Sequence, residues 1–191
     1  TVAAREPGAE SYPLVSGMRL DVERRAVTSP IVGRTHAGLV VETRLDDADA
    51  AIAAAEKAWP RWAATPVATR AGALKRLGDL IERDRGRLVH LMQVEAGKTI
   101  DDALAEIREA VDFCRYYAIE AERLLGAPRD LPGPTGETNR LTLRGRGVFV
   151  AISPWNFPLA IFTGQVAAAL AAGNIVVAKP AEQTPLVAAH A

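Results

Sequence analysis

Residues 148–185 decide the fold, and they read VFVAISPWNFPLAIFTGQVAAALAAGNIVVAKPAEQTP. The stretch opens on a continuous apolar run, residues 148–152, which is typical of a strand covered on both faces. Residues 157–172 are apolar almost all round, as in a buried helix, and Gly173 with Asn174 marks the end of that helix. The first two elements predicted here are therefore a buried strand and a buried helix.

The second half of the stretch repeats this alternation. Residues 175–178 form another apolar run that predicts a buried strand, and Thr184 followed by Pro185 has the form of a helix N-cap with proline in the first turn. The order β-α-β-α predicts an α/β protein with the start of a parallel sheet. Two strands do not complete such a sheet, and Ala191 follows the last helix start by about two turns. We therefore expect an N-terminal piece of a longer protein.

A layer of helices is predicted over residues 46–125, upstream of this stretch. We expect the first helix to be interrupted at Pro60, and the second to begin with Thr65 as its N-cap and Pro66 in its first turn. The last helix has the clearest pattern, because its apolar residues follow one another at intervals of four and three and end before Gly126. These apolar residues are Ile100, Leu104, Ile107, Val111, Cys114, Ala118, Ala121 and Leu125.

The flanks of the helical layer lack helical periodicity. Residues 1–45 contain short apolar runs among glycines and prolines, and they predict an extended arm or a small set of strands. Residues 126–146 are divided between a linker rich in proline and glycine, residues 126–136, and an alternating, half-exposed strand, residues 140–144. The chain is thus expected to consist of an arm, a helical layer, a linker with a strand, and the start of an α/β domain over residues 147–191.

The composition is that of an ordinary soluble domain. The 191 residues include 23 basic and 23 acidic side chains, so the formal net charge is zero and the charge excess of a nucleic-acid-binding protein is missing. No apolar run is long enough for a transmembrane helix, and residues 1–10 lack the apolar core of a signal peptide. The single cysteine, Cys114, fits a reducing compartment. We expect a cytoplasmic protein whose partners include no nucleic acid.

Several apparent motifs are better explained by structure than by chemistry. Residues 95–99 (EAGKT) resemble the end of a phosphate-binding loop, but they follow a predicted helix and the first glycine of that motif is missing. Cys114 lies on the apolar stripe with no histidine nearby, which indicates a buried structural thiol. His36, His90 and His190 have no metal-ligand or triad spacing, so no metal site is expected.

Asn156 is the first candidate site residue. It follows the predicted strand and lies between Pro154 and Pro158, and the loops at the carboxyl ends of parallel strands are where α/β proteins bind ligands. Its side-chain amide can donate a hydrogen bond to negative charge that develops on a substrate oxygen, which is worth about 2.7–4 kcal/mol in a transition state. It can equally cap the following helix, and the sequence leaves both interpretations open.

Lys179 and Glu182 follow the second predicted strand and offer a cation and a carboxylate three residues apart. These groups suit the hydroxyls of a ribose, because the carboxylate accepts hydrogen bonds and the ammonium donates them. Taken alone, such a segment is more often a solvated loop. Two polar motifs at successive strand ends favour a nucleotide cleft shared between them.

Three ordered motifs resemble the aldehyde dehydrogenase superfamily, namely residues 154–159 (PWNFPL), 170–174 (LAAGN) and 179–185 (KPAEQTP). The resemblance implies an N-terminal helical layer followed by the start of a parallel Rossmann-type sheet. Residues 110–117 and 157–165 are similar to the branch that oxidises L-glutamate γ-semialdehyde, the Δ1-pyrroline-5-carboxylate dehydrogenases. Within that branch they resemble the dehydrogenase half of the bifunctional bacterial proline-utilisation proteins.

The resemblance implies roles at matching positions. Asn156 is expected to donate to the oxyanion of a tetrahedral thiohemiacetal, and Phe157 to line the aldehyde tunnel. Residues 152–155 are expected to border the nicotinamide ribose of NAD, largely through their backbone, while two polar side chains hold the adenosine ribose. The cofactor-binding residues implied are Ile152, Ser153, Pro154, Trp155, Lys179 and Glu182.

The resemblance also implies what this chain lacks. The family's nucleophilic cysteine, its general-base glutamate and the Gly-rich turn at the pyrophosphate belong to sequence beyond Ala191, so we expect the isolated chain to be inactive. Expected partners are an aldehyde substrate, the remainder of the enzyme chain and further copies in a homo-oligomer. FAD is expected only if a proline dehydrogenase domain precedes Thr1. The alternatives are another aldehyde dehydrogenase branch, or a non-catalytic helical interaction module that keeps the fold.

Overall fold

The computed structural model describes residues 9–15, 18–19, 23–31 and 36–191. Its strands and helices are, in chain order, β1 (Ala9–Ser11), β2 (Leu14–Val15), β3 (Met18–Arg19), β4 (Arg24–Thr28), β5 (His36–Val41), α1 (Leu45–Ala63), α2 (Val67–Arg83), α3 (Arg85–Ala96), α4 (Ile100–Leu125), β6 (Arg129–Leu131), β7 (Asn139–Leu141), β8 (Val148–Ile152), α5 (Ala160–Ala171), β9 (Ile175–Lys179) and α6 (Pro185–His190).

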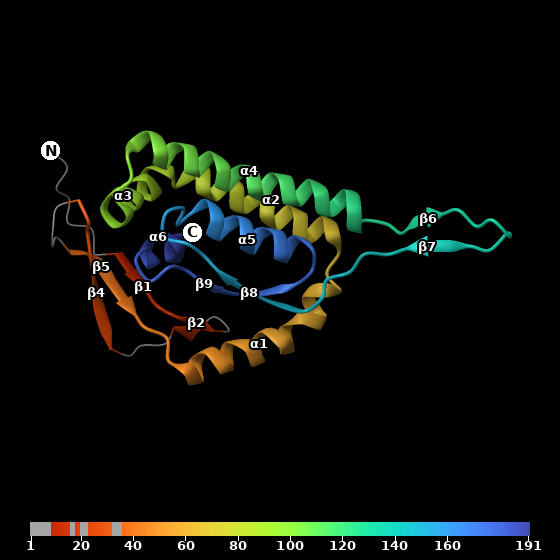
Figure 1. The fold of residues 1–191 in the computed structure, drawn as a ribbon, viewed down its shortest axis with the longest axis horizontal. Helices are drawn as coiled ribbons and strands as arrows, with labels where there is room; N and C mark the ends of the chain where they lie inside the picture. Colours follow the sequence, from red (N-terminus) through yellow and green to blue (C-terminus); the bar gives the residue numbers. More distant parts are fainter. Residues whose placement is uncertain (1–8, 16–17, 20–22, 32–35) are drawn as a thin grey trace.

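The helices and strands form layers. Helices α2 and α4 pack side by side on α5, α5 packs on the two-stranded sheet of β8 and β9, and α1 lies along the other side of that sheet (Figure 1). This arrangement confirms the predicted α/β fold. Among the helices of the described residues, none is both long and apolar enough to cross a membrane.

The described part of residues 1–45 forms small sheets, as the sequence predicted. Strand β5 pairs in parallel with β1 and antiparallel with β4, while β2 pairs antiparallel with β3. A side chain at Gly38 would collide with the carbonyl of Ala9 and with Leu186, so α6 packs directly on β5. The N-terminal sheet and the C-terminal helix therefore share one core.

Helix α4 confirms the predicted apolar stripe over most of its length. Thr99 caps it, because the Thr99 hydroxyl accepts a hydrogen bond from the Asp102 N–H at 3.1 Å. Ile100, the first residue of the helix, is 56% exposed and does not share in the stripe's burial. The buried stripe residues are Ile107, Val111, Cys114, Ala118 and Ala121.

Two predictions about the first helices are wrong. Pro60 does not interrupt α1, which continues to Ala63 although Pro60 has no N–H to donate. Thr65 does not cap α2, because its hydroxyl donates back to the Arg61 carbonyl at 3.0 Å and α2 begins after Pro66 without any side-chain cap. The end of α1 is instead stabilised by tertiary contacts.

Those contacts join the helical layer to the end of α5. The indoles of Trp59 and Trp62 each donate a hydrogen bond of 3.1 Å, and the guanidinium of the buried Arg70 donates one of 3.2 Å. Arg70 also donates to the backbone of the turn between α1 and α2. The carbonyls that accept from Trp59, Trp62 and Arg70 at α5 belong to Gly173, Leu170 and Ala171, respectively.

The predicted β-α-β-α order from residue 147 is confirmed. Strands β8 and β9 pair in parallel, with Ile152 opposite Lys179 at their carboxyl ends. Helix α5 begins at Ala160 rather than at residue 157, because Phe157 precedes a proline and such residues avoid the helical conformation. Gly173, at φ +85°, ends this helical segment as predicted.

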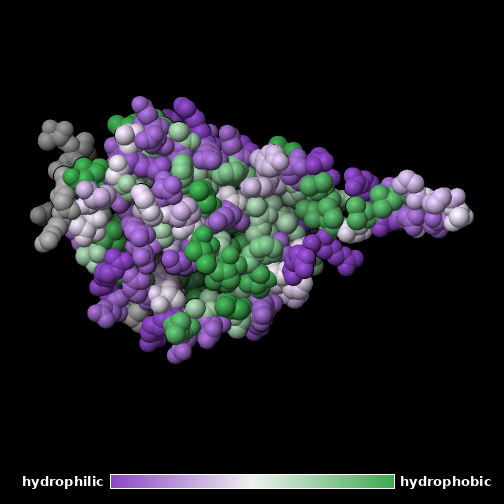
Figure 2. Space-filling view, viewed as in Figure 1, coloured by the Kyte–Doolittle hydropathy of each residue, from purple (hydrophilic) through white to green (hydrophobic). Residues whose placement is uncertain are grey.

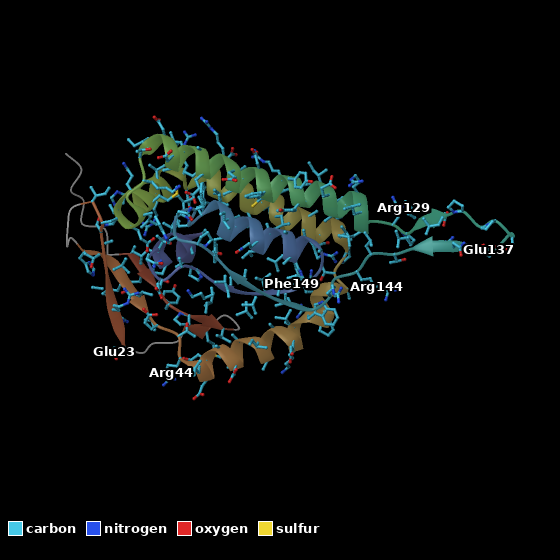
Figure 3. All side chains as sticks on the ribbon, in the orientation of Figure 1. Glu23, Arg44, Arg129, Glu137, Arg144 and Phe149 are labelled. Atoms are coloured by element: carbon cyan, nitrogen blue, oxygen red, sulfur yellow. The ribbon has the colours of Figure 1, made fainter. Side chains whose placement is uncertain are left out.

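The prediction that both strands are covered on both faces is wrong. In β9 the last two residues are exposed and the others are half-buried. Strand β8 pairs only with β9 among the described strands, and its open edge leaves an apolar surface between α5 and α1 (Figure 2). Phe149 lies in this opening (Figure 3). Before the carboxyl end of β8, the exposed large apolar side chains of this strand are Phe149 and Val150, and we call these two the sheet-edge patch.

The predicted linker is a β-hairpin that projects from the body of the molecule (Figure 1). Strands β6 and β7 pair antiparallel, with Arg129 opposite Leu141, and Asp130 forms an ion pair of 3.1 Å with Arg140. The strand predicted over residues 140–144 is accordingly shorter and begins one residue earlier. Arg129 and Glu137 mark the hairpin and Arg144 its base in Figure 3.

Candidate functional site

The connection from β8 to α5 is anchored at its first residue. The Ser153 N–H donates to the Lys179 carbonyl at 3.1 Å, and the Ser153 hydroxyl donates to the Gln165 side-chain oxygen at 2.8 Å. Ser153 is therefore buried and its hydroxyl is used within the protein. Ile152 and Trp155 on either side of it are exposed, at 68% and 56%, and Pro154 is half-buried.

Asn156 is exposed at the middle of this connection. It does not cap α5, because the helix begins four residues later, at Ala160. Within the described part of the chain its side-chain amide has no hydrogen-bond partner. The structure thus excludes the cap interpretation and leaves the amide available to a ligand.

A buried glutamate and a half-buried lysine, whose roles the sequence analysis missed, lie behind this connection. The Glu106 carboxylate, fully buried on α4, accepts hydrogen bonds through Oε1 from the N–H groups of Leu159 (2.7 Å) and Ala160 (3.0 Å). Its Oε2 lies 2.5 Å from the Lys98 ammonium, which in turn lies 4.6 Å from the centre of the Phe157 ring. The signal in the sequence is Glu106 itself, which occupies a position flanking the apolar stripe of α4.

Lys179 and Glu182 lie on the same edge of the sheet as Asn156. Lys179 ends β9 opposite Ile152, and both Lys179 and Glu182 are exposed. The Glu182 carbonyl accepts a hydrogen bond from Arg25 at 3.2 Å, which ties this connection to β4. The parallel pairing of β8 and β9 therefore brings the two predicted polar motifs side by side at the strand ends.

Helix α6, which follows this connection, begins at Pro185 as predicted, but Thr184 does not cap it through its side chain. Glu95 takes that role from α3, accepting from the N–H groups of Leu186 (2.7 Å) and Val187 (2.8 Å). Burial raises the pKa of Glu95 to about 7, although the two N–H donors oppose the shift. Each of the helices that follow β8 and β9 is thus capped by a buried glutamate from the helical layer.

Of the motifs that the sequence analysis rejected, Cys114 stays outside the site. Cys114 is buried, and burial raises the pKa of its thiol to about 11, so it is an inert thiol at neutral pH. Residues 95–99 form no phosphate-binding loop, but two of their side chains support the site from behind, Glu95 at the start of α6 and Lys98 beside Glu106 and Phe157. Gly97 ends α3 in the left-handed conformation and Thr99 starts α4, as expected for a link between helices. Across the described ranges, no cluster of histidine, cysteine or acidic residues could hold a metal ion.

Comparisons with known proteins give a consistent result. Residues 19–191 match the profile described as the aldehyde dehydrogenase family. The bifunctional protein PutA of Escherichia coli is 47% identical over 168 residues, which cover 88% of this chain and 12% of PutA. The 1-pyrroline-5-carboxylate dehydrogenase of Anoxybacillus flavithermus is 39% identical over 182 residues, which cover 94% of this chain and 35% of that enzyme.

A solved structure agrees with these relatives. The 1-pyrroline-5-carboxylate dehydrogenase from Thermus with bound NAD superposes with a TM-score of 0.89 at 34% identity, covering 96% of this chain and 36% of that one. The chain thus spans about an eighth of PutA and about a third of the stand-alone enzymes. On the profile match, which includes the described strands β8 and β9 and both polar connections, the chain belongs to the aldehyde dehydrogenase family.

Proposed function

We propose that this chain is the N-terminal part of an NAD-dependent aldehyde dehydrogenase that oxidises L-glutamate γ-semialdehyde to glutamate in proline catabolism. The observation that carries the proposal is the parallel pairing that brings the Asn156 connection beside Lys179 and Glu182. The names of the relatives, PutA and 1-pyrroline-5-carboxylate dehydrogenase, support the substrate, and the NAD in the Thermus structure supports the cofactor.

The residues at the two strand ends fit NAD. Exposed Lys179 and Glu182 offer a donor and an acceptor for the adenosine ribose hydroxyls. Because the Ser153 hydroxyl is occupied by Gln165, residues 152–155 would meet the nicotinamide ribose through backbone groups and the exposed Ile152 and Trp155 surfaces. NAD, when bound, accepts the hydride from the substrate carbon.

Asn156 would act on the substrate oxygen. Addition of a cysteine thiolate to the aldehyde forms a tetrahedral thiohemiacetal whose oxygen is negatively charged, and the Asn156 amide would donate a hydrogen bond to it. Loss of hydride then leaves a thioester, which water cleaves to the acid and the thiol. The thiolate and the general-base glutamate would come from sequence beyond Ala191, because Cys114 is buried in the helical core. Phe157, 39% exposed beside Asn156, would line the path of the aldehyde.

The exposed apolar surfaces support two protein partners. The sheet-edge patch lies along the open edge of β8, where the remainder of the enzyme chain would add further strands. The β6–β7 hairpin carries exposed Leu131 and Leu141 away from the body, and we propose that it docks on a second copy in a homo-oligomer. FAD would be a cofactor only of an upstream proline dehydrogenase domain, and the cytoplasm is the proposed compartment.

The experiment compares the complete enzyme with the 191-residue chain. The complete protein is expected to reduce NAD when supplied with L-glutamate γ-semialdehyde, as measured by NADH absorbance, whereas the isolated chain is expected to form no NADH. Oxidation of other aldehydes alone would assign a different branch. A complete protein with no activity on any aldehyde would favour the non-catalytic interaction module.

A further inference from the structure

Asn156 lies between two points at which its connection is fastened to the protein. At one end Ser153 is held by Gln165 and by the Lys179 carbonyl. At the other end Glu106 receives the N–H groups of Leu159 and Ala160. We propose that Glu106, paired with Lys98, is a positioning residue that sets where the Asn156 amide points. This inference rests on the proposed function of Asn156 as an oxyanion donor.

Glu106 supplies what α5 lacks locally. The first N–H groups of a helix have no partner inside the helix, and α5 has no side-chain cap of its own. The carboxylate of Glu106 accepts two of these N–H groups with one oxygen, at 2.7 and 3.0 Å, and its side chain is completely buried. Negative charge at this end also complements the helix dipole. The start of α5 is thus located by a residue 53 positions earlier in the chain.

Lys98 links Glu106 to Phe157, the residue that follows Asn156. Its ammonium is 2.5 Å from the second oxygen of Glu106 and 4.6 Å from the centre of the Phe157 ring, and its side chain is 12% exposed. Replacing a buried ion pair by apolar groups is often neutral or stabilising, so a gain in stability does not by itself account for an ion pair at this place. The pair instead fixes the positions of two residues that follow Asn156, because Lys98 contacts the Phe157 ring and Glu106 accepts the hydrogen bond of the Leu159 N–H.

The segment between the two fixed ends is short and stiff. Five residues separate Ser153 from Leu159, and two of them, Pro154 and Pro158, have φ restricted by their rings. With both ends held, Asn156 has little freedom. Without Glu106 only the Ser153 end stays fastened, and a displacement of about 1 Å at a catalytic group costs about 10²-fold in rate.

The geometric part is tested by hydrogen–deuterium exchange on the complete enzyme. Glu106→Ala is expected to speed exchange of the amides of Leu159 and Ala160 by about tenfold or more, since a hydrogen-bonded amide becomes free. Glu109→Ala, at an exposed position one turn along α4, serves as the control and should leave both amides protected. Unchanged protection in Glu106→Ala would overturn the proposed contact whether or not the enzyme is active.

The functional part is tested by a double-mutant cycle with Asn156→Ala. Glu106→Ala is expected to lower kcat by about 10²-fold with little change in KM for NAD, and to add almost nothing in an Asn156→Ala background. A loss that multiplies in the double variant would identify a general structural effect and overturn the positioning role.

If Glu106→Ala does not fold, Glu106→Gln takes its place, because its amide keeps an acceptor oxygen, and this variant should retain most of kcat. A Glu106→Gln variant as impaired as Asn156→Ala would contradict the proposal. A wild-type enzyme that forms no NADH refutes the proposed function instead, and the exchange result is unaffected by that outcome.

Discussion

Glu95 is expected to make the chain less stable as pH rises from 5 to 8. Its pKa is about 7 in the folded protein, against 4.5 for the free side chain, because the carboxyl is buried between α3 and α6. A pKa that folding raises favours the protonated carboxyl, so its contribution to stability is fully present below pH 4.5 and is lost as pH passes through 7. At 1.36 kcal/mol per pKa unit the whole loss is about 3 kcal/mol, of which about 2–3 falls between pH 5 and 8.

The assay compares urea unfolding of the chain with that of Glu95→Gln at pH 5 and pH 8. The amide side chain of this variant does not titrate, so the free energy of unfolding of the original chain should fall by about 2–3 kcal/mol relative to the variant over this interval. Glu109→Gln, at an exposed position of α4, is the matched control and should follow the original chain at both pH values. Parallel pH profiles for the original chain and Glu95→Gln would refute the reasoning.

Four further predictions concern single side chains. Arg70→Met should lower the free energy of unfolding by about 3 kcal/mol or more in urea titration, because it removes charged donors from the buried Ala171 carbonyl and from two half-buried carbonyls; a loss below about 1 kcal/mol would contradict this. Gly164→Val should cost about 1–3 kcal/mol in the same assay, because a Cβ at this position lies 2.8 Å from the Phe113 ring; an unchanged midpoint would mean that the ring moves freely. In the complete enzyme, Asn156→Ala should reduce kcat by about 10²–10³-fold with NAD affinity retained, and full turnover would exclude the oxyanion role. Glu182→Ala should weaken NAD binding about tenfold in calorimetric titration, and unaltered affinity would remove it from the ribose site.

Local pattern was enough to predict the elements that build the core. The apolar stripe of α4 repeats at helical intervals, and the two short continuous apolar runs on either side of α5 have the length of buried strands. Together they indicated the α/β order correctly. The hairpin was missed because its residues are almost all exposed and carry no burial pattern, while its prolines and glycines are typical of a linker. The exposure of β8 was missed for a related reason, because an apolar run in the sequence does not show whether other strands or helices of the same chain cover that strand.

The candidate site divides in the same way. Asn156, Lys179 and Glu182 could be found because they follow strands directly, and strand order alone brings them together. Glu95 and Glu106 could not, because each acts on backbone groups more than 50 residues away in the sequence. The Glu95 contact also explains why Thr184, which has the residue type of a cap, does not cap α6 through its side chain. Thr65 does not cap α2 for a local reason, because its hydroxyl donates to the Arg61 carbonyl.

Helix α5 is restrained lengthwise, and this has a mechanical consequence. Its 12 residues span about 18 Å, with the Glu106 carboxylate at one end and the Arg70 guanidinium at the other. Both side chains come from the helical layer, so any sliding or rotation of α5 about its axis would break contacts at both ends. The helical layer therefore fixes the position of α5 along its axis, and with it the position of the residues that precede Ala160. A substitution beside Trp62 that shifts the end of α5 would therefore also shift the start of α5 and the connection that carries Asn156, although Trp62 is remote from the strand ends.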